Sequence, residues 1–180
     1  MRKPRAVSKQ ILEEAFELLD RHVDRSTRII IGGGAAMVLA YDLPLSTLDV
    51  DAFTAKGGIP IDELDAAAKQ VAERLGIAPD WLNAHFVTFT HVLPGDYGTR
   101  LHPVFQGKSL SVAALGPEDL ILMKCFSGRD KDRPHALRLI RLCRNLDIVD
   151  RRIEELIQKR VPGAERAADY FDDLRDEVGI

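Results

Sequence analysis

The sequence predicts an α/β (α+β) protein, in which helices flank a small mixed sheet and a helical C-terminal portion follows. Three observations lead to this fold class. A β-branched apolar run, Ile29–Ile31, ends at three glycines and passes into an Ala/Leu-rich segment, as a buried strand followed by a helix would. Residues 48–52 alternate between apolar side chains and carboxylates. Beyond Leu115, only helical patterns follow.

Composition limits the organisation of the chain and its partners. A chain of 180 residues with 46% hydrophobic residues supports one domain with a helical appendage. We expect an α/β core with its N-terminal helix over 1–116 and a helical portion packed on it over 117–180. The net charge of −3 gives no general attraction to nucleic acid or to an anionic membrane.

No targeting or membrane signal is evident in the apolar pattern. The longest apolar runs are too short for a transmembrane span, and no signal-peptide core follows the basic N-terminus. We therefore expect a cytoplasmic protein without a membrane partner. Cys125 and Cys143 lie in apolar helical patterns without metal-ligand spacing, and we interpret them as core thiols.

The first four elements follow from apolar periodicity. Residues 8–22 are expected to form a helix because apolar residues recur at helical spacing. The run 28–31 reads as a buried strand, and 33–41 as a helix that begins at the glycines. Residues 48–53 alternate as a strand does.

The middle of the chain predicts one helix and three strands. Residues 61–75 are rich in alanine, begin with acids and end at a glycine, which favours a helix. The stretch 84–92 alternates like a strand. Residues 101–106 and 109–114 are expected to form a hairpin around a glycine-containing turn.

Four helices complete the prediction. Pro117 stands at a first helical position, with acids behind it, so a helix over 117–126 is expected. Three more are expected over 133–146, 148–160 and 163–177, with a Pro-Gly pair separating the last two.

Asp49 and Asp51 are the acidic pair of greatest interest. In a strand, residues two apart point to the same face, so these carboxylates project together while Leu48, Val50 and Ala52 face the core. Like charges at such positions repel, and a divalent cation relieves the repulsion. The plain alternative is a solvated strand face.

The glycines Gly32–Gly34 mark the beginning of a helix. Free N–H groups at a helix N-terminus bind anions, and glycines let a phosphate approach the backbone. The alternative is a tight strand-to-helix turn without a ligand. A Rossmann dinucleotide site is disfavoured, because Met37 stands where its third small residue would be.

These residues resemble the signature of the nucleotidyltransferase superfamily, the fold of DNA polymerase β and of kanamycin nucleotidyltransferase. The signature is an apolar strand, two small residues, a short helix, and two acids separated by one residue on the next strand. Gly33 and Gly34, with Gly32 as an alternative register, and the sequence Asp49-Val50-Asp51 match it, and Thr47 stands just before the acidic strand.

Later motifs resemble a bacterial branch of nucleotidyltransferase-like proteins related to the abortive-infection toxins of type IV toxin–antitoxin systems. The matching stretches are Asp80–Asn83, Pro117–Lys124 and Arg129–Asp132. This resemblance implies transfer of a nucleoside monophosphate from a nucleoside triphosphate to a hydroxyl, with RNA among the acceptors. It also implies an antitoxin protein as a partner.

The resemblance implies a site with defined roles. Asp49 and Asp51 would be catalytic ligands of Mg²⁺ or Mn²⁺. The nucleotide would be bound by Gly33, Gly34, Thr47 and Lys124. From spacing alone, Lys124 has an alternative role, in which its stem lies along an apolar helix face.

One part of the superfamily pattern is not evident. Active members carry a third carboxylate on a later strand, and the expected strands after residue 84 contain no Asp or Glu. Asp96, in a turn between them, is our choice for the third catalytic acid, and Asp80 is the other. The alternative function is a catalytically degenerate nucleotide-binding or protein-interaction module of the same fold.

Two aromatic or imidazole features have simpler interpretations. Trp81 is expected to be a packing anchor. His85 and His91 lie on one face of the expected strand 84–92, and six residues at about 3.3 Å each place them too far apart for one metal ion.

Overall fold

The structure, a computed structural model, describes residues 7–43, 47–129 and 132–180. Asp130 and Lys131, which belong to one of the matched motifs, lie outside the described residues. The chain forms two compact units. The first consists of residues up to Val87 together with Leu101–Leu115, and the second of Thr88–Arg100 together with Gly116–Ile180.

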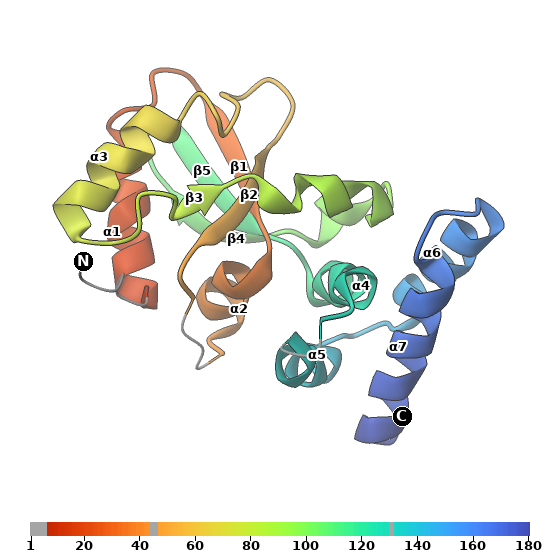
Figure 1. Ribbon diagram of the computed structural model, residues 1–180. Coiled ribbons are helices and arrows are strands. Elements are labelled where there is room, and N and C mark those ends of the chain that lie inside the picture. The colour runs from red at the N-terminus through yellow and green to blue at the C-terminus, as the bar shows by residue number, and fades with distance from the viewer. Residues whose placement is uncertain (1–6, 44–46, 130–131) are drawn as a thin grey trace. The chain divides into compact units, whose positions relative to one another are not determined.

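The first unit is built on a five-stranded mixed sheet (Figure 1). Its strands are β1 (Thr27–Ile31), β2 (Val50–Thr54), β3 (Leu82–Asn83), β4 (His102–Gln106) and β5 (Leu110–Ala114), in the order β3-β2-β1-β5-β4. β1 is antiparallel to β2 and parallel to β5, while β2 and β3 are parallel and β4 and β5 antiparallel. The predicted fold class and the predicted hairpin are thereby confirmed.

Three helices pack around this sheet. They are α1 (Lys9–Asp20), α2 (Gly33–Tyr41) and α3 (Asp65–Leu75). α1 and α2 contact the strands directly, and α3 lies beside α1 (Figure 1). Central strand β1 is buried on both faces, since Ile29, Ile30 and Ile31 are all at most 3% exposed. Because both faces of β1 are buried, its sequence is an uninterrupted apolar run rather than an alternating pattern.

Trp81 is a packing anchor in the first unit, as the sequence predicts. Its side chain is fully buried, and its ring lies 5.8 Å from that of Phe16 in α1. The indole N–H donates to the carbonyl of Ala68 in α3 at 2.9 Å, so the one polar atom of this side chain is satisfied. Trp81 therefore joins α1, α3 and the chain entering β3.

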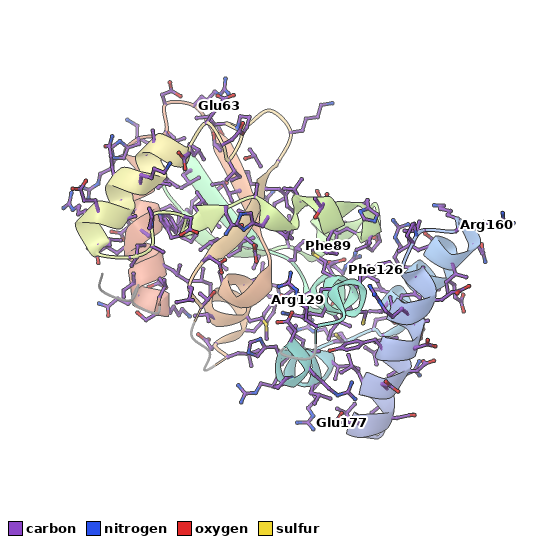
Figure 2. All side chains as sticks on the ribbon, in the orientation of Figure 1. Glu63, Phe89, Phe126, Arg129, Arg160 and Glu177 are labelled. Carbon is purple, nitrogen blue, oxygen red and sulfur yellow. The ribbon has the colours of Figure 1, made fainter. Side chains whose placement is uncertain are left out.

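The second unit is helical. It contains the short 3₁₀ helix η2 (Tyr97–Arg100) and the helices α4 (Pro117–Ser127), α5 (Arg133–Ile140), α6 (Asp147–Gln158) and α7 (Ala164–Val178). The core of this unit is apolar and includes Leu120, Ile121, Leu139, Ile153, Phe171 and Leu174. Arg133 of α5 donates to Glu177 near the end of α7, labelled in Figure 2. None of the helices described is long and apolar enough to cross a membrane.

The predicted helices are present, and all but α2 have shifted ends. Ser8 caps α1 with its side chain, and Gly76 and Gly128 end α3 and α4 in the left-handed conformation. The helix expected over 133–146 is shorter, because α5 ends at Ile140. Both cysteines are free thiols: Cys125 is buried and Cys143 partly so.

The strand predicted over 84–92 is wrong. Residues His85–Val92 form a 3₁₀ helix, η1, and only Leu82–Asn83 pair with the sheet. The burial pattern fits a period of three, since Phe86 and Val92 are buried and Phe89 is half-buried, while Val87, Thr88 and His91 are exposed. A 3₁₀ helix has three residues per turn, which aligns these side chains. The same aromatic and β-branched residues also fit the alternating pattern of a strand, and for this reason the sequence predicted a strand here.

The acidic strand begins later than the sequence predicts. β2 starts at Val50, so Asp49 lies just before it. Val50 and Ala52 are fully buried, as predicted, but Leu48 is 54% exposed rather than facing the core. Strand alternation does not extend to Leu48 because that residue lies outside the strand.

Candidate functional site

The topology of the first unit brings the glycines and the acids together. Because β1 and β2 are antiparallel, the end of β1 lies beside the start of β2. Ile31 pairs with Ala52, and the N–H of Gly32 donates to the carbonyl of Asp51 at 3.0 Å. α2 begins at Gly33, so its N-terminus lies next to the acidic segment.

The glycines make room for side chains of the acidic segment. Gly33 has φ +58°, and a Cβ there would lie 2.7 Å from Oδ2 of Asp51. A Cβ on Gly34 would lie 3.1 Å from the hydroxyl oxygen of Thr47. Both side chains therefore approach the first turn of α2 closely. The positive end of the helix dipole favours the carboxylate of Asp51 at this position.

Asp49, Asp51 and His85 form a group whose ligand atoms lie close enough together to hold one metal ion. One ligand atom from each side chain lies within 4.8 Å of the other two. The two carboxylates are partly accessible to solvent, and His85 is exposed. The residues come from three places in the fold: the approach to β2, β2 itself, and the start of η1.

Asn83 connects the parts of this group. It pairs with Asp51 in the parallel β2–β3 ladder and is only 8% exposed. Its side-chain amide donates to Oδ2 of Asp49 at 3.4 Å, and its carbonyl oxygen accepts the backbone N–H of His85 at 2.9 Å. One buried side chain thus contacts the carboxylate of Asp49 and fixes the start of η1.

The sequence did not reveal His85 or Asn83 as members of the site. On the expected strand 84–92, the spacing relates His85 to His91, six residues away, and gives no link to the acids. Asn83 stands in a matched motif but carries no charge. The period of three in Phe86, Phe89 and Val92 was the available signal that His85 begins a helix.

Thr47 holds the backbone that leads to Asp49. Its hydroxyl donates to the carbonyl of Asp49 at 2.8 Å, and its own carbonyl accepts the N–H of Val7. Val7 and Thr47 form an isolated antiparallel bridge, and both are buried. The chain just before α1 therefore supports the acidic segment.

The donor set fits a divalent cation. Carboxylate oxygens bind Mg²⁺ and Mn²⁺, and imidazole nitrogen binds first-row transition metals. The nearby first turn of α2 has N–H groups without carbonyl partners in the helix, which suits an anionic phosphate.

Asp96 and Lys124 belong to the second unit, where each is in an ion pair. Asp96 accepts from Arg100 at 3.0 Å, and this contact lowers the pKa of its carboxyl group. Lys124 of α4 pairs with Asp132 at 3.1 Å, with both side chains mostly buried. The roles predicted for Asp96 in catalysis and for Lys124 in nucleotide binding stay predictions.

Comparison with known proteins identifies a family. No curated protein and no solved structure matches the chain. The model of one protein family, described as "Nucleotidyltransferase of unknown function (DUF6036)", matches residues 9–167, which include the glycines, the acidic group and the helices from α4 into α7. The chain therefore belongs to this nucleotidyltransferase family.

Proposed function

We propose that the protein transfers a nucleoside monophosphate from a nucleoside triphosphate to a hydroxyl acceptor, with Mg²⁺ or Mn²⁺ as the cofactor. Family membership supports nucleotidyl transfer and a triphosphate substrate. The observation that supports the metal dependence is the proximity of Asp49 and Asp51, whose ligand atoms lie within 4.8 Å beside the first turn of α2.

Asp49 and Asp51 are proposed to hold the cation. Two carboxylates close together repel each other, and the cation offsets this repulsion. When bound, the cation lowers the pKa of the attacking hydroxyl and stabilises charge on the α-phosphate and the leaving pyrophosphate. Asn83 keeps Asp49 oriented through its amide N–H, and Thr47 fixes the backbone at Asp49.

The first turn of α2 is proposed to bind the triphosphate. The backbone N–H groups of Gly33 and Gly34 belong to the helix N-terminus, where anions bind through those groups and the dipole. Thr47 would contribute by positioning, because its hydroxyl already donates to the carbonyl of Asp49. In the second unit, Lys124 is proposed as a further phosphate contact.

Asp96 is proposed to orient the acceptor hydroxyl. Its lowered pKa makes it a weaker base but leaves it an ionised hydrogen-bond acceptor. Such a role affects turnover more than nucleotide affinity. RNA is the acceptor to test first, as the resemblance to toxin-related proteins implies.

A transfer assay tests this function. The full-length protein is incubated with each α-labelled triphosphate, Mg²⁺ or Mn²⁺, and total RNA, and label on RNA or protein is measured. We expect transfer by the wild type and none above background by Asp49→Asn/Asp51→Asn. Asp96→Asn should lower turnover about tenfold or more at unchanged nucleotide affinity. Asp62→Asn, a change at an exposed acid outside the proposed site, is the matched control and should leave turnover unchanged.

The outcomes separate the two functions. Transfer that persists in the Asp49→Asn/Asp51→Asn variant would place the chemistry elsewhere. A wild type that binds triphosphate but transfers to no acceptor would instead be a nucleotide-binding module. Equal turnover in Asp96→Asn and wild type would exclude Asp96 as the third acid.

A further inference from the structure

His85 is held firmly although its side chain is exposed. Two nearby residues are buried: Asn83, two positions before it, and Phe86, directly after it, are each 8% exposed. Asn83 accepts the backbone N–H of His85 at 2.9 Å, a local side-chain cap that begins η1. The imidazole therefore leaves the backbone from a fixed point beside Asp51, the register partner of Asn83.

Phe86 fixes the other side of His85. Its ring lies 5.7 Å from the ring of Phe53 in β2. A Cβ on Gly32 would lie 2.9 Å from a ring carbon of Phe86, so the absence of a side chain at Gly32 admits this ring. The first glycine of the turn thus serves the placement of η1, and with it the placement of His85.

The donor set that results is mixed. Asp49 and Asp51 offer oxygen atoms, and His85 offers a ring nitrogen within 4.8 Å of both. Mg²⁺ prefers an all-oxygen octahedral environment, whereas an imidazole ligand favours first-row transition metals. Among those, Mn²⁺ also accepts carboxylate oxygens readily.

We propose that His85 is the third protein ligand of the cation held by Asp49 and Asp51, and that it makes this site select Mn²⁺ over Mg²⁺. The inference rests on the proposed metal site and adds a ligand and a metal preference to it. Asn83 is a positioning residue for this ligand, since it contacts both Asp49 and the backbone of His85.

Direct metal binding to the full-length protein tests the proposal without any activity measurement. Mn²⁺ alone is titrated and followed by electron paramagnetic resonance, and Mg²⁺ affinity is measured by competition. We expect Mn²⁺ to bind more tightly than Mg²⁺, and the bound Mn²⁺ to show nitrogen coupling from a directly bound imidazole. His85→Ala should remove this coupling and weaken Mn²⁺ binding about tenfold or more, with little change for Mg²⁺.

Two further variants sharpen the test. His85→Asp gives an all-oxygen donor set and should shift the preference toward Mg²⁺. His91→Ala is the matched control, because His91 belongs to the same 3₁₀ helix and its Nδ1–H donates to the carbonyl of Thr88 at 2.7 Å. This control should retain both the nitrogen coupling and the wild-type affinities.

Each result has a distinct meaning. Bound Mn²⁺ without nitrogen coupling, or unchanged Mn²⁺ affinity in His85→Ala, would overturn the role of His85 and leave the carboxylate site standing. If the nitrogen coupling disappeared in His91→Ala instead of in His85→Ala, the bound nitrogen would belong to His91, and the proposal for His85 would be wrong. If the wild type bound neither ion, the proposed metal site would fail together with this inference.

Discussion

At the scale of single residues, the glycines have a more specific role than the sequence indicates. The pattern predicts a turn that lets a phosphate approach the backbone. In the structure, the space left by the missing side chains is used by Phe86 at Gly32, by Asp51 at Gly33 and by Thr47 at Gly34. The same glycines therefore make room for protein groups at the site.

Gly33→Ala tests this role. The residue has φ +58°, and its new Cβ would lie 2.7 Å from Oδ2 of Asp51. The left-handed conformation costs a non-glycine residue about 1–3 kcal/mol. We expect that loss in the free energy of unfolding, measured with urea, and a fall in Mn²⁺ affinity because the carboxylate must move.

The matched control is Gly76→Ala. Gly76 has φ +66°, and a Cβ there meets nothing within 4 Å. This variant should lose comparable stability but keep wild-type Mn²⁺ affinity. If Gly33→Ala also kept its Mn²⁺ affinity, the close approach of Asp51 to Gly33 would have no part in metal binding.

At the scale of elements, helices and strands with a clear apolar pattern were predictable from the sequence. The segments that connect them around Asp49, Asn83 and His85 were not. The pattern at 33–41 predicted α2 with its observed ends, and the apolar run at 28–31 predicted β1. η1 was missed because its residues fit a period of two as well as a period of three. The contacts of Asn83 depend on the pairing of β3 with β2, which no local pattern specifies.

Asp20 joins two elements that lie far apart in the sequence. It is the last residue of α1, and its carboxylate accepts the backbone N–H groups of Lys108, Ser109 and Leu110 at 2.8, 2.9 and 2.6 Å. Burial raises the pKa of Asp20, but these three hydrogen bonds and the charge of Lys108 outweigh it, and the pKa is lowered. The carboxylate thereby fixes the β4–β5 hairpin.

This contact predicts a pH-dependent stability. Because the folded-state pKa of Asp20 lies below its unfolded value, the stabilisation is complete above that unfolded value and is lost as the pH falls through the folded-state pKa. Asp20→Asn should cost about 1–2 kcal/mol at pH 7, since charge-assisted hydrogen bonds are lost. Urea unfolding at several pH values measures this.

The difference between wild type and Asp20→Asn should shrink below about pH 4, the ordinary range of an aspartate. Asp62→Asn, a change at an exposed acid, serves as the control and should show no such trend. A constant difference between wild type and Asp20→Asn from pH 7 to pH 3 would contradict the account of this hairpin.

At the scale of the whole molecule, the sequence predicted a mixed sheet followed by helices, and the structure contains both. It did not indicate that Thr88–Arg100 is grouped with the helical residues. Two arginines hold this segment within the second unit. Arg100 donates twice to the buried Asp119 of α4, and Arg152 of α6 donates to the carbonyls of His91 and Val92. Such long-range pairs leave no periodic signal.

The net charge of the whole chain limits how the protein could recognise an anionic ligand. The net charge of −3 gives no general attraction to nucleic acid. We therefore propose that recognition of a triphosphate depends on the local arrangement at Asp49, Asp51 and the first turn of α2, where the carboxylates would hold a cation. This arrangement is the central claim.

A thermal-shift measurement on the full-length protein tests that claim most directly. A nucleoside triphosphate with Mg²⁺ or Mn²⁺ at a hundredfold excess over Kd should stabilise the folded state by about 2.7 kcal/mol, a rise in Tm of roughly 5–10 °C. We predict this rise for the wild type and its loss in the folded Asp49→Asn/Asp51→Asn variant. An equal rise in that variant would show that the nucleotide binds elsewhere and would contradict the site described.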